Sequence, residues 1–173
     1  MSSGPSHDSA RDFEDVRAYT LESDDEAALL EAQTECTIIW LGSDGHPMGV
    51  IVNFIFRKGS FWLTATEMRP RIAAMRKDPR VSIAVSSKGS SVTARQSVTY
   101  KGRATLHTDE QTIDWFVPEF SRAMRPDSPA AAESFGTHLR SPGRVVIELV
   151  PHKRVGFDST KMWAAAPSAA PDA

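Results

Sequence analysis

Three apolar segments in the first half of the chain are joined by turns too short to hold a helix. Residues 35–42 (ECTIIWLG), 48–56 (MGVIVNFIF) and 61–66 (FWLTAT) are β-branched or aromatic, and only SDGHP and RKGS separate them. The Asp-Gly pair in the first connection is a strong hairpin signal. Because parallel strands need crossovers of a dozen or more residues, this region argues against a parallel α/β sheet and predicts three antiparallel strands.

Alternation along 48–56 predicts which of its side chains face the core. One face carries Val50, Val52, Phe54 and Phe56, and the other carries Ile51, Asn53, Ile55 and Arg57. Asn53 interrupts an apolar strand, and a buried amide must find hydrogen-bond partners. Two interpretations stay open for it, a contact to a ligand or a hydrogen bond at the edge of a dimer.

The rest of the chain adds three strands and four short helices. Strands are predicted at 80–87, 97–107 and 143–150, and helices at 23–33, after Pro70, at 109–124 and at 130–139. Gly102 lies inside a strand, which predicts a bulge or a close approach. Six strands with hairpin connections predict a mainly β (α+β) fold, an antiparallel barrel with short flanking helices.

Length and composition limit the function classes. The 173 residues suit one domain at 17–163, between a polar arm (1–16) and an Ala/Pro tail (164–173) that we expect to be disordered. A net charge of -2 and the lack of a basic, aromatic face argue against nucleic acid. One cysteine, Cys36, excludes an intrachain disulfide. We expect no metal and no membrane span, and a cytoplasmic location.

A basic stretch, MRPRIAAMRKDPR (68–80), stands out in this slightly acidic chain. Pro70 suits the first turn of a helix, and Arg71 follows it directly, soon after Thr64 and Thr66. Phosphate is held by charge-assisted donors near a helix start. The alternative is a solvated basic face, the usual fate of such runs.

Several of these blocks together resemble a known family. DGHPMGVIVNFIF, GSFWLTATEMRPRIAAMRKDPRVSIAV, VTYKGRATL and RVVIELVPHKRVGFD are similar to the flavin-binding split-barrel proteins related to pyridoxamine 5'-phosphate oxidase. The resemblance implies a split barrel and a homodimer, with two flavins between the subunits and each flavin touched by both chains. It implies FMN as the cofactor or, alternatively, a deazaflavin of the F420 type.

The resemblance also implies the cofactor-binding residues. Arg71 takes the place of the family's phosphate-binding basic residue, with Arg69 assisting. The strand end supplies Thr64, Ala65 and Thr66, the ring lies against Val50, Ile51, Val52 and Asn53, and the next strand offers Gln96 and Ser97. Val50 and Ile55 stand where the pyridoxamine phosphate oxidases carry an arginine and a lysine, which favours the looser branch of the family.

The implied function is an FMN-dependent oxidoreductase that acts on a small organic substrate. Two alternatives remain, a deazaflavin-dependent reductase and a non-enzymatic flavin-binding carrier. No catalytic side chain is named, because in flavin chemistry the cofactor carries the electrons.

Overall fold

The computed structural model describes residues 16–165 and 167. The predicted disordered arm (1–16) and tail (164–173) lie outside this range, except for Val16, Ala164, Ala165 and Pro167. The elements are η1 (Val16–Tyr19), α1 (Ser23–Ala32), β1 (Glu35–Leu41), β2 (Pro47–Asn53), β3 (Ile55–Arg57), β4 (Ser60–Thr66), α2 (Pro70–Lys77), β5 (Arg80–Ser86), β6 (Gln96–His107), α3 (Glu110–Met124), α4 (Pro129–Leu139), β7 (Arg144–Asp158) and α5 (Ser159–Ala165).

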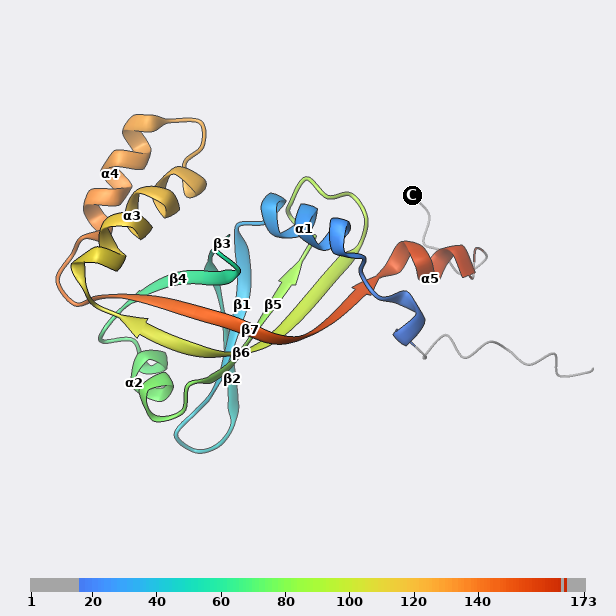
Figure 1. The fold of residues 1–173 in the computed structure, drawn as a ribbon, viewed down its shortest axis with the longest axis horizontal. Coiled ribbons are helices and arrows are strands. Elements are labelled where there is room, and N and C mark those ends of the chain that lie inside the picture. The colour runs from blue at the N-terminus through green and yellow to red at the C-terminus, as the bar shows by residue number, and fades with distance from the viewer. Residues whose placement is uncertain (1–15, 166, 168–173) are drawn as a thin grey trace, which may run out of the picture.

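One antiparallel sheet forms the body of the molecule (Figure 1). Its order is β2-β1-β5-β6-β7-β4-β3, and it curls into a split half-barrel. The described residues contain seven strands, whereas six were predicted. The extra strand arises because the predicted strand 48–56 breaks at Phe54 into β2 and β3, which lie at opposite edges of the sheet.

The break at Phe54 turns the chain from one sheet edge to the other. The last β1–β2 pair joins Glu35 to Asn53, and the Phe54 N–H then donates to the Thr34 carbonyl at 3.0 Å. Ile55 already pairs with β4. The Phe54 side chain is buried in the barrel, so burying this ring holds the bend at the point where a straight strand was expected.

Two apolar clusters lie on opposite sides of β4. The larger one fills the barrel and includes Phe54 and Phe61, with Val50 and Val52 packed against it. The smaller one lies beneath α3 and α4, which Figure 1 shows as a pair outside the barrel; its members are Ile55, Trp62, Phe116, Val117, Phe120, Leu139 and Val146. The predicted alternation of 48–56 is therefore confirmed on both faces.

The last strand is longer than predicted. It was expected over 143–150, but β7 continues through Pro151 to Asp158. The β6–β7 register shifts between Lys101 and Gly102, where Gly102 faces Pro151. A Cβ on Gly102 would lie 2.6 Å from the Val150 carbonyl oxygen. The close approach and the bulge predicted at Gly102 are both present, and a bulge is where a strand tolerates proline.

Candidate functional site

The basic stretch begins where β4 leaves the sheet. The Glu67 N–H donates to the Gly143 carbonyl (2.8 Å) and the Arg69 N–H to the Thr66 carbonyl (3.0 Å), which fixes the turn before α2. Pro70 is the first residue of α2, as predicted, and no side chain caps the helix. Ile72 and Met75 are buried in the barrel core. Since these contacts anchor α2, Arg71 is held in its first turn.

Arg71 has a half-buried guanidinium that lacks a counter-charge among the described residues. Its Nε is buried and has no hydrogen-bond partner in the part of the chain that the structure describes. Burial, and secondarily the positive charge of Arg69, lowers the pKa of Arg71. A buried donor left unpaired costs about 1–3 kcal/mol. The arrangement is therefore suited to an anion that would supply the missing acceptor.

Two other arginines of the stretch, Arg76 and Arg80, are already neutralised. Arg76 forms a two-point ion pair with Glu67, with Nη2–Oε2 at 2.7 Å. The hydrogen bond with Arg76 lowers the pKa of Glu67. Arg80 binds Asp78 at 2.6 Å and lowers the pKa of Asp78 to about 2. Arg76 and Arg80 are exposed and their carboxylate partners half-buried, so this part of the stretch is the solvated basic face of the alternative interpretation.

The β4 residues expected to contact phosphate differ in whether their side chains can donate a hydrogen bond to it. The Thr64 hydroxyl donates to the Val145 carbonyl at 2.9 Å, so its proton is already used. The Ala65 side chain is buried in the core. Thr66 is half-buried and its hydroxyl has no bond among the described residues. Thr66 is therefore the better placed of the two threonines to donate to a ligand.

Strand β2, which carries Val50, Ile51, Val52 and Asn53, also contacts β4. β2 pairs only with β1, and β3 covers β4 only from Ser60 to Trp62. Among the described residues, β2 therefore has one backbone edge without a strand partner, and β4 has one from Leu63 to Thr66. Asn53 is exposed rather than buried as expected, and its amide donates to the Thr34 carbonyl at 3.2 Å within the same chain.

Gln96 and Ser97 lie at the other end of the barrel. The end of β6 at His107 pairs with Val146, which in turn pairs with Thr64 on β4, so His107 lies beside the strand end that precedes Arg71. Ser97 lies ten residues earlier on β6. At about 3.3 Å per residue, roughly 30 Å of strand separates Ser97 from His107. Gln96 is also buried, with its Nε2 3.4 Å from Asp158 Oδ2. One chain therefore does not bring Gln96 and Ser97 to Arg71.

A separate hollow surrounds Gln96 and Ser97. Its volume is about 590 Å³, and its lining includes Lys88, Arg95 and Trp163. The two cations have no ion pair among the described residues. Sequence reasoning did not single them out, because they lie in a Ser/Gly-rich segment that reads as an ordinary loop.

A hydrogen-bonded chain outside the barrel was also not predicted. Ser60 Oγ donates to Glu148 Oε1 (2.9 Å), and His107 Nε2 lies 3.0 Å from Glu148 Oε2. The carboxylate lies between the serine and the histidine, so the imidazole cannot act as a base on Ser60. The three residues are up to 88 positions apart, and no sequence pattern connects them.

Cys36 is buried, and burial raises its thiol pKa to about 12. At pH 8 about one thiol in 10,000 would then be thiolate, compared with roughly a quarter for an ordinary cysteine. We predict that the native protein resists a colourimetric disulfide reagent at pH 8 and releases one equivalent of thiol only in denaturant. Fast labelling of the native protein, at the rate of free cysteine, would contradict this.

Two further observations concern the described residues. They contain no helix that is both long and apolar enough to cross a bilayer. Nowhere among them do three or more His, Cys, Asp or Glu side chains come together as metal ligands.

Comparisons with known proteins support the split-barrel fold. The family model described as pyridoxamine 5'-phosphate oxidase matches residues 24–155. A comparison with curated proteins finds no match. Among solved structures, a conserved hypothetical protein of Mycobacterium tuberculosis is similar, with a TM-score of 0.73 and 16% identity over 91% of this chain and 96% of that one.

Two other similar structures carry names that mention a cofactor. An FAD-binding protein of Mesorhizobium loti has a TM-score of 0.58 and 17% identity, over 80% of this chain and 96% of its own. A protein named F420 reductase has a TM-score of 0.54 and 18% identity, over 73% of this chain and 93% of its own. At such identities the likeness shows a shared fold.

Proposed function

Because this chain belongs to the pyridoxamine 5'-phosphate oxidase family, we propose that it is an oxidoreductase that binds FMN and acts on a small organic substrate. The observation that carries the proposal is the buried, unpartnered Nε of Arg71 in the first turn of α2. A phosphate there would accept a charge-assisted hydrogen bond that no described residue provides. Arg69 and Thr66 would add charge and a hydroxyl donor beside it.

The protein's own part in the reaction would be binding and orientation. The flavin would supply the chemistry, by accepting and returning an electron pair as hydride. Arg71 would fix the phosphate end, and the open backbone edge of Val50–Asn53 would face the ring. This role fits the described part of the chain, in which no catalytic acid–base pair stands out beside Arg71.

We propose that the site is completed by a second copy of the chain. Arg71 and Ser97 are too far apart along one barrel to touch the same cofactor, so Gln96 and Ser97 would contact the flavin held by the partner's Arg71. The edge strand β2 offers a surface for pairing, since Ile51 is 71% exposed and Met48 50% exposed. Exposed apolar side chains on an unpaired edge strand are typical of an interface.

Ile51→Lys is expected to shift the protein from dimer to monomer, because a lysine on this edge would place an unpaired charge in the contact. Sedimentation velocity at micromolar protein measures the change. Ser134→Lys, an exposed change on α4, serves as the control and should leave the dimer intact. A wild-type protein that sediments as a monomer, or an Ile51→Lys dimer as tight as wild type, would contradict the proposal.

A deazaflavin of the F420 type is the second candidate, supported by the exposed cations near Arg71. Arg69 and Lys77 are exposed and have no ion pair among the described residues. They could hold the anionic tail of such a cofactor. A carrier that binds FMN without turnover is the third candidate.

Purified protein separates these candidates. The absorbance spectrum and mass of the copurifying small molecule are measured first, and FMN and the deazaflavin are then titrated into cofactor-free protein. A yellow FMN complex whose flavin is reduced by NADH or NADPH, or reoxidised by a small-molecule acceptor, supports the oxidoreductase. Tight FMN binding without reaction with any donor or acceptor supports the carrier, and binding of the deazaflavin alone supports the second candidate.

A further inference from the structure

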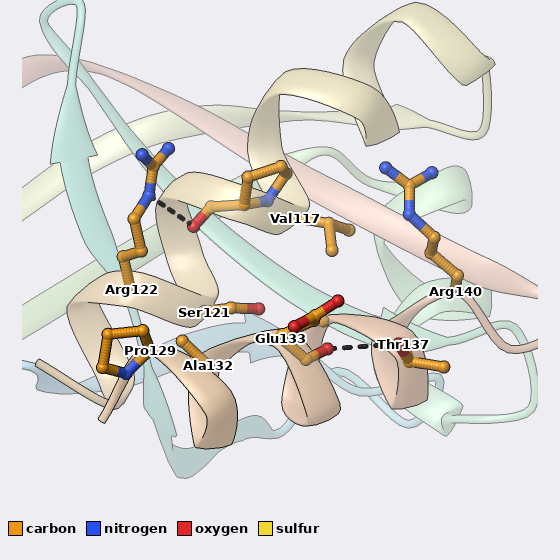
Figure 2. A pocket seen from close by; sticks show the side chains of 10 residues that line it. Val117, Ser121, Arg122, Pro129, Ala132, Glu133, Thr137 and Arg140 are labelled. Atoms are coloured by element: carbon orange, nitrogen blue, oxygen red, sulfur yellow. Dashed lines mark hydrogen bonds between the residues drawn. The ribbon is translucent and has the colours of Figure 1, made fainter.

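A groove separates α3 from α4 on the outside of the barrel (Figure 2). Its volume is about 460 Å³, within the range of about 300–1,000 Å³ of small-molecule sites. Its walls are largely apolar and are formed by Val117, Pro118, Pro129, Ala132 and Gly136. The groove shares no residue with β2, β4 or α2, so it is separate from the proposed cofactor site.

The floor of the groove carries a buried hydroxyl without a partner. Ser121 is 2% exposed, and its Oγ has no hydrogen bond within the described chain. Figure 2 shows this hydroxyl between the two helices. Buried polar groups in native proteins almost always find a partner. An unpaired hydroxyl lining a cavity therefore indicates that something else supplies the missing bond.

The charged side chains around the groove do not all have partners of opposite charge among the described residues. Arg122 is paired with Glu119 and bonds the Pro118 carbonyl, and Arg140 lies 2.7 Å from Asp114. Glu133 also lines the groove, and its carboxylate has no ion pair among the described residues. Thr137 Oγ1 donates to the backbone carbonyl of Glu133 at 3.1 Å and does not engage its carboxylate. The uncompensated charge of the lining is thus negative.

We propose that this groove binds a small apolar molecule that carries a protonated amine. The apolar body would lie against Val117, Pro118 and Pro129. The ammonium would pair with Glu133, and the Ser121 hydroxyl would gain a hydrogen-bond partner. An anionic ligand is disfavoured, because both arginines of the rim already hold carboxylates.

Gly136 provides a variant that closes the groove without removing a polar group. A Cβ at this position would lie 3.2 Å from Ser121 Oγ and 3.5 Å from Val117 Cγ1. Gly136→Ala therefore fills the floor, while alanine raises the helix propensity of α4. Glu133→Gln is the second variant. It keeps the size of the exposed side chain and removes only its charge.

The test uses benzylamine as the probe, with benzyl alcohol and benzoate as neutral and anionic comparisons. Amide shifts of the ¹⁵N-labelled full chain are followed during each titration. We expect saturable shifts confined to α3 and α4, with the amine binding most tightly at about millimolar Kd. Glu133→Gln should weaken the affinity for benzylamine about 5-fold and leave the affinity for benzyl alcohol unchanged, and Gly136→Ala should abolish the binding of both.

Three results would overturn the proposal. They are the absence of saturable shifts in α3 and α4, tighter binding of benzoate than of benzylamine, and equal weakening of benzylamine and benzyl alcohol by Glu133→Gln. Glu133 is exposed, so its replacement does not threaten folding, and the test stands even if Gly136→Ala destabilises the protein. FMN affinity of these variants should match wild type, which keeps this test independent of the proposed cofactor site.

Discussion

Arg71→Ala is expected to weaken FMN binding about 10- to 150-fold. A hydrogen bond to a charged group contributes about 1.5–3 kcal/mol, and each 1.4 kcal/mol is about tenfold in Kd. The stability of the cofactor-free protein should hardly change, because the buried Nε of Arg71 has no partner to lose and relief of this unpaired donor offsets the packing lost with the side chain. Quenching of flavin fluorescence during titration measures the affinity, and thermal unfolding without cofactor measures the stability.

Arg76→Ala is the matched control for this prediction. Arg76 lies on the same helix and carries the same charge, but it is exposed and paired with Glu67. Its loss should change the FMN affinity by no more than about 2-fold, through weak long-range electrostatics. Equal effects of the two substitutions would mean that only the net charge of α2 matters. Unchanged affinity in Arg71→Ala would remove Arg71 from the site.

Phe61→Ala is expected to lower the free energy of unfolding by about 3–5 kcal/mol, the usual cost of truncating a buried phenylalanine. Phe61 on β4 is fully buried, and its ring lies 4.8 Å from those of Phe56 and Tyr100 and 5.5 Å from that of Phe54. Phe61 thus packs against Phe54 at the bend and against Phe56 in β3. Chemical denaturation at fixed protein concentration measures the loss.

Phe61→Leu separates cavity formation from loss of the aromatic contacts. Leucine keeps most of the buried volume, so the expected loss is only about 1–1.5 kcal/mol. A loss below about 1 kcal/mol in Phe61→Ala would show that this part of the core relaxes around the cavity. The account of the bend at Phe54 as a packed, aromatic-anchored corner would then be wrong.

Local sequence patterns predicted most of the elements that build the barrel. Strand β5 was expected at 80–87 and lies at Arg80–Ser86, and helix α3 was expected at 109–124 and lies at Glu110–Met124. These segments have a clear period of two residues or of three to four, with turn residues at their ends. Pro70 likewise marked the start of α2.

The structure departs from the predictions where contacts between residues that are not neighbours in the sequence determine the course of a strand. Apolar alternation runs through Phe54 without interruption, so nothing local marks the bend that separates β2 from β3. Pro151 was taken as the end of a strand, but the bulge opposite Gly102 allows β7 to continue past it. At Phe54 the contacts come from Thr34, 20 positions away, and Phe61, seven positions away. At Pro151 the contact comes from Gly102, 49 positions away.

The candidate site was predictable only in part, for the same reason. The position of Arg71 after Pro70 can be read from the sequence, and the family resemblance led to it. That Arg76 is neutralised while Arg71 is not depends on Glu67, nine residues from Arg76. The hydrogen bond from the Thr64 hydroxyl to the carbonyl of Val145, 81 residues away, could not be foreseen from the sequence. The roles of all these residues toward a cofactor stay predictions.

The central claim is that Arg71 holds a phosphate, and a comparison of FMN with riboflavin tests it most directly, since the two ligands differ only in that group. The dissociation constants of both are measured for wild type and for Arg71→Ala. We predict that wild type binds FMN at least tenfold more tightly than riboflavin and that most of this preference disappears in the variant. Equal preference for FMN in both proteins would contradict the claim.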